Sequence, residues 1–206
     1  MDIHQFKIGD VKDEGELSVP ALAKVIKELK IMIHGLPYSG TLIEKNSRQL
    51  NIDFDDALFR KLSDNKWSLE KKPRLNMPDL CGDLGNPEAD LIVSSNGLHR
   101  IKTVIEVEKG NKKTIWFDFI KMWIFIEAKK ADFGVLICPV NYAHKLGVWP
   151  LFDEALKYKK YLGRFAGVTE KKLNSIGIIG YQQMIKNGSN YTLWDEKEFN
   201  RIKKIT

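Results

Sequence analysis

Cysteine is scarce in this sequence of 206 residues, which contains only Cys81 and Cys138. Two cysteines provide neither a disulfide framework nor a recognisable pair of metal ligands. Apolar runs long enough to span a membrane are missing, and the sequence does not start with the charged and then apolar segments of a secretion signal. We therefore expect a protein of the cytoplasm, where thiols stay reduced.

Internal repeats, low-complexity tracts and linkers are also missing, so residues 1–206 are predicted to form a single domain, with enough chain for one core. The four histidines are scattered and lack the spacing of a zinc site. The segment Gly177-Ile178-Ile179-Gly180 lacks the Lys-Ser or Lys-Thr pair that completes a phosphate-binding loop. These absences argue against zinc-dependent and nucleotide-binding proteins.

Positive charge is in modest excess, with 33 Lys and Arg against 27 Asp and Glu and a net charge of +6. This excess is equally compatible with a soluble protein that happens to be basic and with a protein that binds an anionic partner. Lysines crowd around Glu70, around Glu108 and within residues 157–160. If these groups share one face, they form a footprint for a phosphate backbone.

Helix signals occur in the first third of the sequence. Ser18 is a suitable N-cap for a helix that has Pro20 in its first turn and runs toward Ile33. A second helix is predicted over residues 55–62 by the apolar spacing and the acidic start. Residues 76–88 are rich in Gly, Pro, Asn and Asp, which predicts a loop.

The centre of the sequence has the clearest pattern. Strands are predicted at residues 89–93 and 98–108, joined by the turn Ser94-Ser95-Asn96-Gly97. A strongly apolar helix at 114–131 and a continuous apolar strand at 134–140 follow, and together they predict a parallel strand–helix–strand unit. A lysine-rich helix at 151–162 and a strand at 175–181 complete an α/β layer structure.

Carboxylates at the end of the second central strand point to a metal site. Glu106 and Glu108 are two residues apart, so both side chains face the same side of the strand. Two neighbouring carboxylates at the end of a buried strand require a proton or a cation, and Asp90 on the partner strand can reach the same ion. Three hard oxygen ligands favour Mg²⁺, and Glu108 is our candidate for the general base. Alternatively, the glutamates form a solvated charge ladder with Lys102 and Lys109.

These residues resemble the PD-(D/E)xK nuclease superfamily, in the variant that has a glutamate in place of the lysine. The closest likeness within it is to the BamHI group of type II restriction endonucleases, in three stretches that occur in the same order. The stretches are Trp67-Ser68-Leu69-Glu70, Glu106-Val107-Glu108-Lys109-Gly110-Asn111 and Gly134-Val135-Leu136-Ile137-Cys138-Pro139. The resemblance covers residues 67–139 and implies a restriction-endonuclease-like core, in which helices flank a mixed central β-sheet.

The resemblance also implies roles for individual residues. Asp90 and Glu106 would bind the metal through their carboxylates, and Val107 would bind it through its carbonyl. Glu108 would be the general base. Glu70 would reach the metal site, although its position equally suits a surface ion pair with Lys72 or Arg74.

The sequence departs from that group directly after the strand. Only Asn111 agrees there, because Lys112 and Lys113 stand where the group has small polar residues and then an arginine. Asn111 can pair with an adenine edge in the major groove, but it is also an ordinary turn residue. Asn111, Lys112 and Lys113 are therefore candidate DNA contacts, and the recognised DNA sequence stays open.

The sequence thus predicts a type II restriction endonuclease that hydrolyses double-stranded DNA with Mg²⁺ and has a separate cognate methyltransferase. The helix 114–131 is apolar on nearly every side, with Asp118 and Lys121 as the main interruptions, which favours a homodimer packed through this helix. The alternatives are a repair or mobile-element nuclease on the same fold, and a DNA-binding protein without catalysis. Whether the site holds one metal ion or two is also open.

Overall fold

The computed structural model describes residues 3–41, 47–76, 86–95, 100–110, 112–144, 147–165 and 169–203. The strands are β1 (Ile3–Asp13), β2 (Pro37–Thr41), β3 (Ser68–Lys71), β4 (Leu91–Ser94), β5 (Lys102–Val107), β6 (Phe133–Pro139), β7 (Tyr142–His144), β8 (Gly147–Trp149), β9 (Ile176–Asn187) and β10 (Asn190–Leu193). The helices are α1 (Pro20–Ile33), α2 (Ser47–Asp64), α4 (Ile115–Glu127), α5 (Leu151–Phe165), α6 (Glu170–Leu173) and α7 (Glu196–Lys203).

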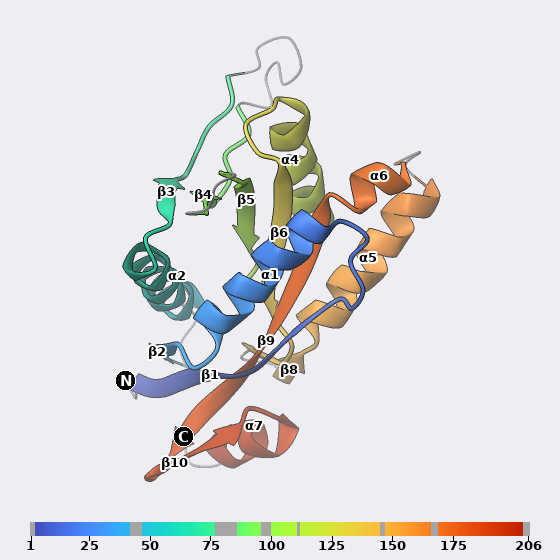
Figure 1. Cartoon of the computed structure of the whole chain (residues 1–206). Coiled ribbons are helices and arrows are strands. Elements are labelled where there is room, and N and C mark those ends of the chain that lie inside the picture. The colour runs from blue at the N-terminus through green and yellow to red at the C-terminus, as the bar shows by residue number, and fades with distance from the viewer. Residues whose placement is uncertain are drawn as a thin grey trace.

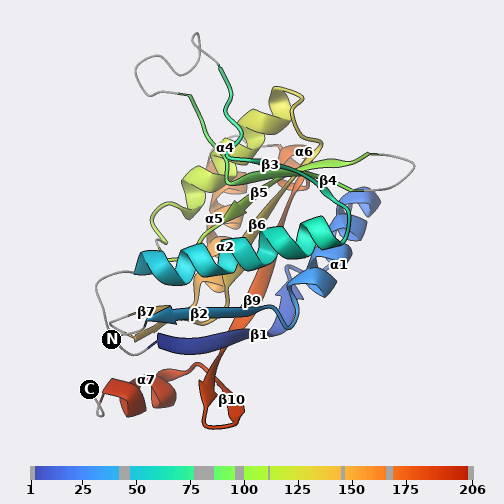
Figure 2. The same ribbon diagram turned by 90° about the vertical axis from the view of Figure 1, so that its left-hand side faces the viewer.

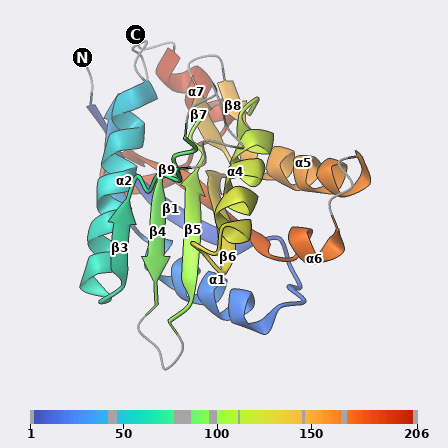
Figure 3. The same cartoon turned by 90° about the horizontal axis from the view of Figure 1, so that it is seen from above.

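A mixed β-sheet forms the centre of the molecule (Figure 1). Among the described residues its strand order is β2-β1-β9-β6-β5-β4-β3, and β10 pairs with β9. The central pairs β5–β6 and β6–β9 are parallel, whereas β1–β9, β4–β5 and β3–β4 are antiparallel. Figure 3 shows β3, β4 and β5 side by side at one edge. The predicted α/β class is confirmed.

Each face of the sheet carries its own apolar core. Helices α1 and α2 cover one face, where they pack on Ile105 and Val107 of β5; α2 crosses the near side of the sheet in Figure 2. Helices α4 and α5 cover the other face, where Val104 of β5 lies. Because side chains alternate along a strand, Glu106 lies on the face of Val104, under α4.

The predicted central unit is confirmed, with a correction at the turn. β4 pairs antiparallel with β5, and β5 pairs parallel with β6 across the helix α4. The second strand begins at Lys102 and not at residue 98. Ser94 pairs with Lys102, and the Lys102 N–H donates a hydrogen bond to Asp132 Oδ2 at 2.8 Å. Of the predicted turn 94–97, Ser94 belongs to β4, whereas residues 96 and 97 lie outside the described residues.

Other boundaries also differ from the prediction. Ser18 is not the N-cap of α1: Val19 holds that position without a side-chain cap, and Pro20 starts the helix. α2 begins at Ser47, well before the acidic start that we used as its signal. Most of the predicted loop 76–88, including Cys81, lies outside the described residues. No helix in the described part of the chain is long and apolar enough to cross a membrane.

The glycines of Gly177-Ile178-Ile179-Gly180 have a packing role in β9. A Cβ on Gly180 would lie 2.4 Å from the Phe152 ring of α5, and a Cβ on Gly177 would lie 2.1 Å from the terminal methyl of Ile26 in α1. The two positions face opposite sides of the strand. Glycine therefore lets one helix approach each face of the central strand closely.

We expect Gly180→Ala to lower the free energy of unfolding by about 1–3 kcal/mol, because the new methyl group overpacks a buried ring. Gly177→Ala should have a smaller effect, since the end of the Ile26 side chain can rotate away. Urea denaturation of both variants measures this difference. Equal transitions for the wild type and Gly180→Ala would contradict the close packing of α5 on β9.

Candidate active site

Asp90 and Glu106 are brought together by the β4–β5 hairpin. Leu91 pairs with Ile105, so the same register places Asp90 opposite Glu106 at the end of β5. The Oδ2 atom of Asp90 accepts a hydrogen bond from the N–H of Val107 at 2.8 Å. This bond fixes the Asp90 carboxylate against the end of β5, next to Glu106, as the sequence predicts.

Glu106 is a buried carboxylate held by a lysine from α4. Its side chain is 3% exposed, and its Oε2 accepts a hydrogen bond from Lys121 Nζ at 2.7 Å. Lys121 also contacts Asp118 Oδ1 at 3.1 Å, one helical turn earlier. The second oxygen of Glu106, Oε1, is buried and has no hydrogen-bond partner among the described residues. A buried, unpaired carboxylate oxygen is costly unless a proton or a cation satisfies it.

Burial dominates the electrostatics of this cluster. It raises the pKa of Glu106 to about 9; Lys121 opposes the shift, while Asp90 and Asp118 increase it. Burial also raises the pKa of Asp118 to about 7, again opposed by Lys121 and increased by Glu108. Desolvation lowers the pKa of Lys121, but Glu106 and Asp118 outweigh it, so the net shift is upward. The carboxylates thus exceed the positive charge that the cluster supplies.

Glu108 has a different environment from Glu106. Its Oε1 accepts hydrogen bonds from the N–H groups of Lys109 and Gly110 at 2.8 and 2.9 Å, and its Oε2 accepts one from Thr114 Oγ1 at 2.6 Å. A Cβ on Gly110 would lie 2.7 Å from the Tyr142 hydroxyl, so only glycine fits this turn without displacement. In this structure Glu108 ties the end of β5 to the start of α4.

A further carboxylate, Asp55, approaches the site from α2. It forms an ion pair with Lys109, and its Oδ1 is buried without a hydrogen-bond partner among the described residues. Burial raises the pKa of Asp55, Lys109 opposes this, and Asp90 increases it. Asp55 and Asp90 therefore lie within electrostatic reach of each other.

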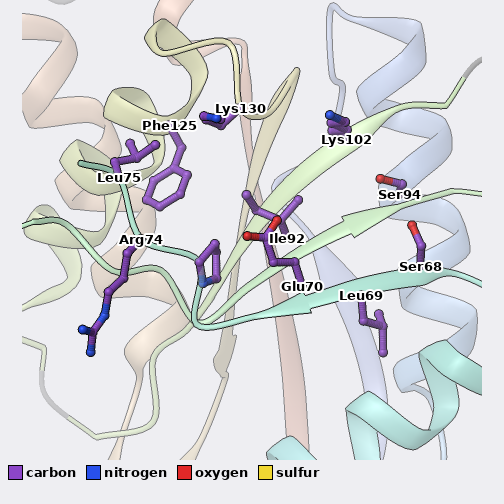
Figure 4. Close-up of a pocket in the computed structure, with 11 residues that line it drawn as sticks. Ser68, Leu69, Glu70, Arg74, Leu75, Ile92, Ser94, Lys102, Phe125 and Lys130 are labelled. Atoms are coloured by element: carbon purple, nitrogen blue, oxygen red, sulfur yellow. The ribbon is translucent and has the colours of Figure 1, made fainter. Parts of the chain in front are cut away.

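Glu70 lies in a neighbouring pocket and not in the cluster itself. The pocket has a volume of about 280 Å³, and Glu70 faces it beside Ile92 (Figure 4). Glu70 is exposed and pairs with Ile92, which lies two residues after Asp90, so Glu70 lies one row of same-face side chains away from Asp90. Such rows are roughly 7 Å apart along a strand. Lys102 and Lys130 line the same pocket.

The predicted DNA contacts follow the cluster in the chain. Lys112 and Lys113 are exposed, and Asn111 lies outside the described residues. Two lysines of the predicted basic groups are held in ion pairs, Lys109 with Asp55 and Lys159 with Glu14. Other members of these groups are exposed, namely Lys66, Lys71, Lys72, Lys157 and Lys160.

The structure adds residues that we did not predict from the sequence. Asp118 and Lys121 stood out only as interruptions in an apolar helix, yet their i, i+3 spacing on the helix that crosses over Glu106 was a usable signal. Within the described ranges, no three side chains of His, Cys, Asp or Glu converge to hold a metal ion. Asp90 and Glu106 are the predicted ligands that the fold brings together, while Glu108 turns toward backbone amides.

Residues 97–181 match the family model described as "Putative halobacteria restriction endonuclease". This segment holds β5, α4, β6, α5 and the first part of β9, so it contains Glu106 and Lys121 but not Asp90. The match covers less than half of the chain. It supports a restriction-endonuclease-like family and a nuclease function in general, and the mixed sheet with helices on both faces is consistent with that core. A comparison with curated proteins finds no match.

The raised pKa values predict a pH dependence of stability. The folded protein binds more protons than the unfolded chain between about pH 4.5 and 9 at Glu106, and between about pH 3.8 and 7 at Asp118. These groups therefore make stability fall as pH rises through these ranges. We expect Glu106→Gln to flatten this fall and to raise Tm of the metal-free protein at pH 8.5, by about 2–4 °C for each kcal/mol of desolvation cost and repulsion removed.

Thermal unfolding of the metal-free protein from pH 5 to 9 measures this effect. Glu127→Gln is the matched control, because Glu127 lies on the same helix with a side chain that is 61% exposed. The same pH slope for the wild type and Glu106→Gln would contradict the assignment of Glu106 as the desolvated carboxylate.

Proposed function

We propose that the protein is a magnesium-dependent DNA endonuclease of the type II restriction kind. The observation that carries this proposal is the Asp90–Glu106 pair at the end of β5, in which a buried Glu106 oxygen has no partner among the described residues. The family match over residues 97–181 supports a nuclease independently of that geometry. A cation at this pair would relieve both the unpaired oxygen and the excess of carboxylates.

The donor groups present suit a hard divalent cation. Asp90 and Glu106 offer carboxylate oxygens, which Mg²⁺ prefers. The Val107 N–H points to Asp90, and in an extended strand the carbonyl of the same residue points to the same side, so Val107 can offer its carbonyl there. When bound, Mg²⁺ would polarise the scissile phosphate and lower the pKa of a coordinated water.

The chain's own residues would orient these donors. Val107 holds one oxygen of Asp90 and leaves the other available. Lys121 holds one oxygen of Glu106 in the same way. Glu108 remains our candidate for the general base, and its carboxylate already accepts hydrogen bonds from Thr114 and two backbone amides, which would compete with a water for it. Glu70 lies one row away and is proposed to reach the site only through water or substrate.

The proposed substrate and assembly have surface features in their favour. Lys112 and Lys113 are exposed directly after the turn that Glu108 holds, where they can contact phosphates. Trp116 and Phe117 are 44% and 50% exposed at the start of α4, which supports a homodimer that buries them. A dimer of this kind would place two sites on one duplex.

Asp90→Asn should lower cleavage of double-stranded DNA by several orders of magnitude, because it removes a charged metal ligand. Binding of DNA in Ca²⁺ should persist. The measurement is single-turnover cleavage of phage DNA with Mg²⁺, and Asp132→Asn, an exposed carboxylate at the other end of β5, is the control. Full cleavage in excess chelator, or by Asp90→Asn, would reject the metal site.

The pattern of products separates the alternatives. Discrete fragments support a restriction enzyme, whereas a smear or structure-dependent nicks support a repair or mobile-element nuclease. Binding without any metal-dependent cleavage supports a DNA-binding protein that lacks catalysis.

A second variant tests the role of Glu108. Glu108→Gln keeps an oxygen that can accept the amide hydrogen bonds but cannot act as a general base at neutral pH. If Glu108 is the base, cleavage should fall by about 100-fold or more with little change in Tm. Thr114→Ala is the companion variant, since it removes the hydroxyl that donates to Oε2 and keeps the carboxylate. Near-normal cleavage by Glu108→Gln would assign Glu108 to holding the turn.

A further inference from the structure

We infer that Lys121 is a positioning residue for the proposed metal site: it acts through Glu106 by binding one carboxylate oxygen and presenting the other toward Asp90. This inference rests on the proposed metal-dependent nuclease function. It assigns a role to a residue of α4 that lies outside the carboxylate motif of β5.

The geometry of Glu106 supports this role. Its two oxygens are in different states, because Oε2 accepts from Lys121 at 2.7 Å while Oε1 is buried without a partner among the described residues. A carboxylate held at one oxygen cannot rotate freely about its last torsion, so the direction of the other oxygen is set. The unpaired oxygen is therefore the one available to a cation.

The position of Lys121 is itself fixed. Its side chain is 16% exposed and bridges Glu106 and Asp118, whose side chains are 3% and 10% exposed. Asp118 lies one turn earlier on α4, so the helix presents both groups to the same face of the sheet. The contacts from Asp118 to Lys121 and from Lys121 to Glu106 thus link the first turns of α4 to the end of β5.

Partners of this kind affect metal sites in a characteristic way. A group that hydrogen-bonds a metal ligand fixes its orientation, and its removal typically lowers metal affinity or activity by about 10–100-fold. A lysine that only balances charge would act in the opposite direction, because its removal would leave the site more negative and strengthen binding of a divalent cation. The two roles therefore predict opposite changes in metal affinity.

The test is calorimetric titration of the folded protein with Mn²⁺ alone, without DNA. We expect Lys121→Met to weaken Mn²⁺ binding by about 10–100-fold and Lys121→Arg, which can donate to both carboxylates, to restore most of the affinity. The matched control is Lys159→Met. Lys159 lies on α5, has a side chain that is 14% exposed, and forms an ion pair with Glu14 at 2.6 Å. It should bind Mn²⁺ like the wild type.

Asp118→Asn provides the answer if Lys121→Met does not fold. It retains Lys121 and removes a carboxylate whose pKa burial raises, so the variant should fold at least as stably as the wild type. It leaves the ammonium held by Glu106 alone, and Mn²⁺ binding should weaken less than in Lys121→Met.

Unchanged or tighter Mn²⁺ binding in Lys121→Met overturns the inference, and so does unchanged binding in Asp118→Asn where Lys121→Met does not fold. If the wild type binds Mn²⁺ normally in these experiments, the proposed function still stands. A wild type that neither binds Mn²⁺ nor cleaves DNA overturns the proposed function and this inference together.

Discussion

The burial of Glu106 is the constraint on which the arrangement around β5 depends. Its carboxylate lies on a sheet face with many apolar side chains, among them Ile92, Val104 and Leu136, under a helix that is itself largely apolar. A charge in such a layer is unfavourable unless it is paired. Lys121 supplies one partner, and Asp118 holds that partner in place. The second oxygen of Glu106 has no partner among the described residues, and this unpaired oxygen is the reason why we propose a cation at this end of β5.

The surrounding elements converge on the same point from different parts of the chain. The β4–β5 register places Asp90 beside Glu106, and the turn after β5 is held by Glu108 through two amides and Thr114. α2 adds Asp55 from the opposite face. The site is thus built on packed strands and helix starts, which fix side chains more firmly than loops do.

Much of this could be predicted from local patterns. Alternation and the apolar run at residues 134–140 gave the hairpin, the parallel partner strand and the crossover helix, and the spacing of Glu106 and Glu108 marked the end of the strand. The prediction missed what depends on contacts between distant segments. In the sheet, β1 lies between β2 and β9. β9 extends to Asn187, although only the first half of its sequence has the pattern of a buried strand. Ser18 suits an N-cap, yet α1 starts after Val19, because the residue before a proline favours extended backbone and Val19 has φ −105° and ψ 105°.

The sequence by itself determined the α/β class, the central strand–helix–strand unit and the adjacency of Asp90 and Glu106, because these follow from periodicity and from pairing between neighbouring strands. Only the tertiary structure decided what each carboxylate contacts. Alternation gives Glu106 and Glu108 the same face, but the donors within reach set their directions: a lysine of the crossover helix for Glu106, and backbone amides with Thr114 for Glu108. The two amides directly follow Glu108 in the chain, whereas Thr114 and Lys121 belong to α4 and its N-cap. Their approach is set by packing of α4 on the sheet, which no local pattern encodes.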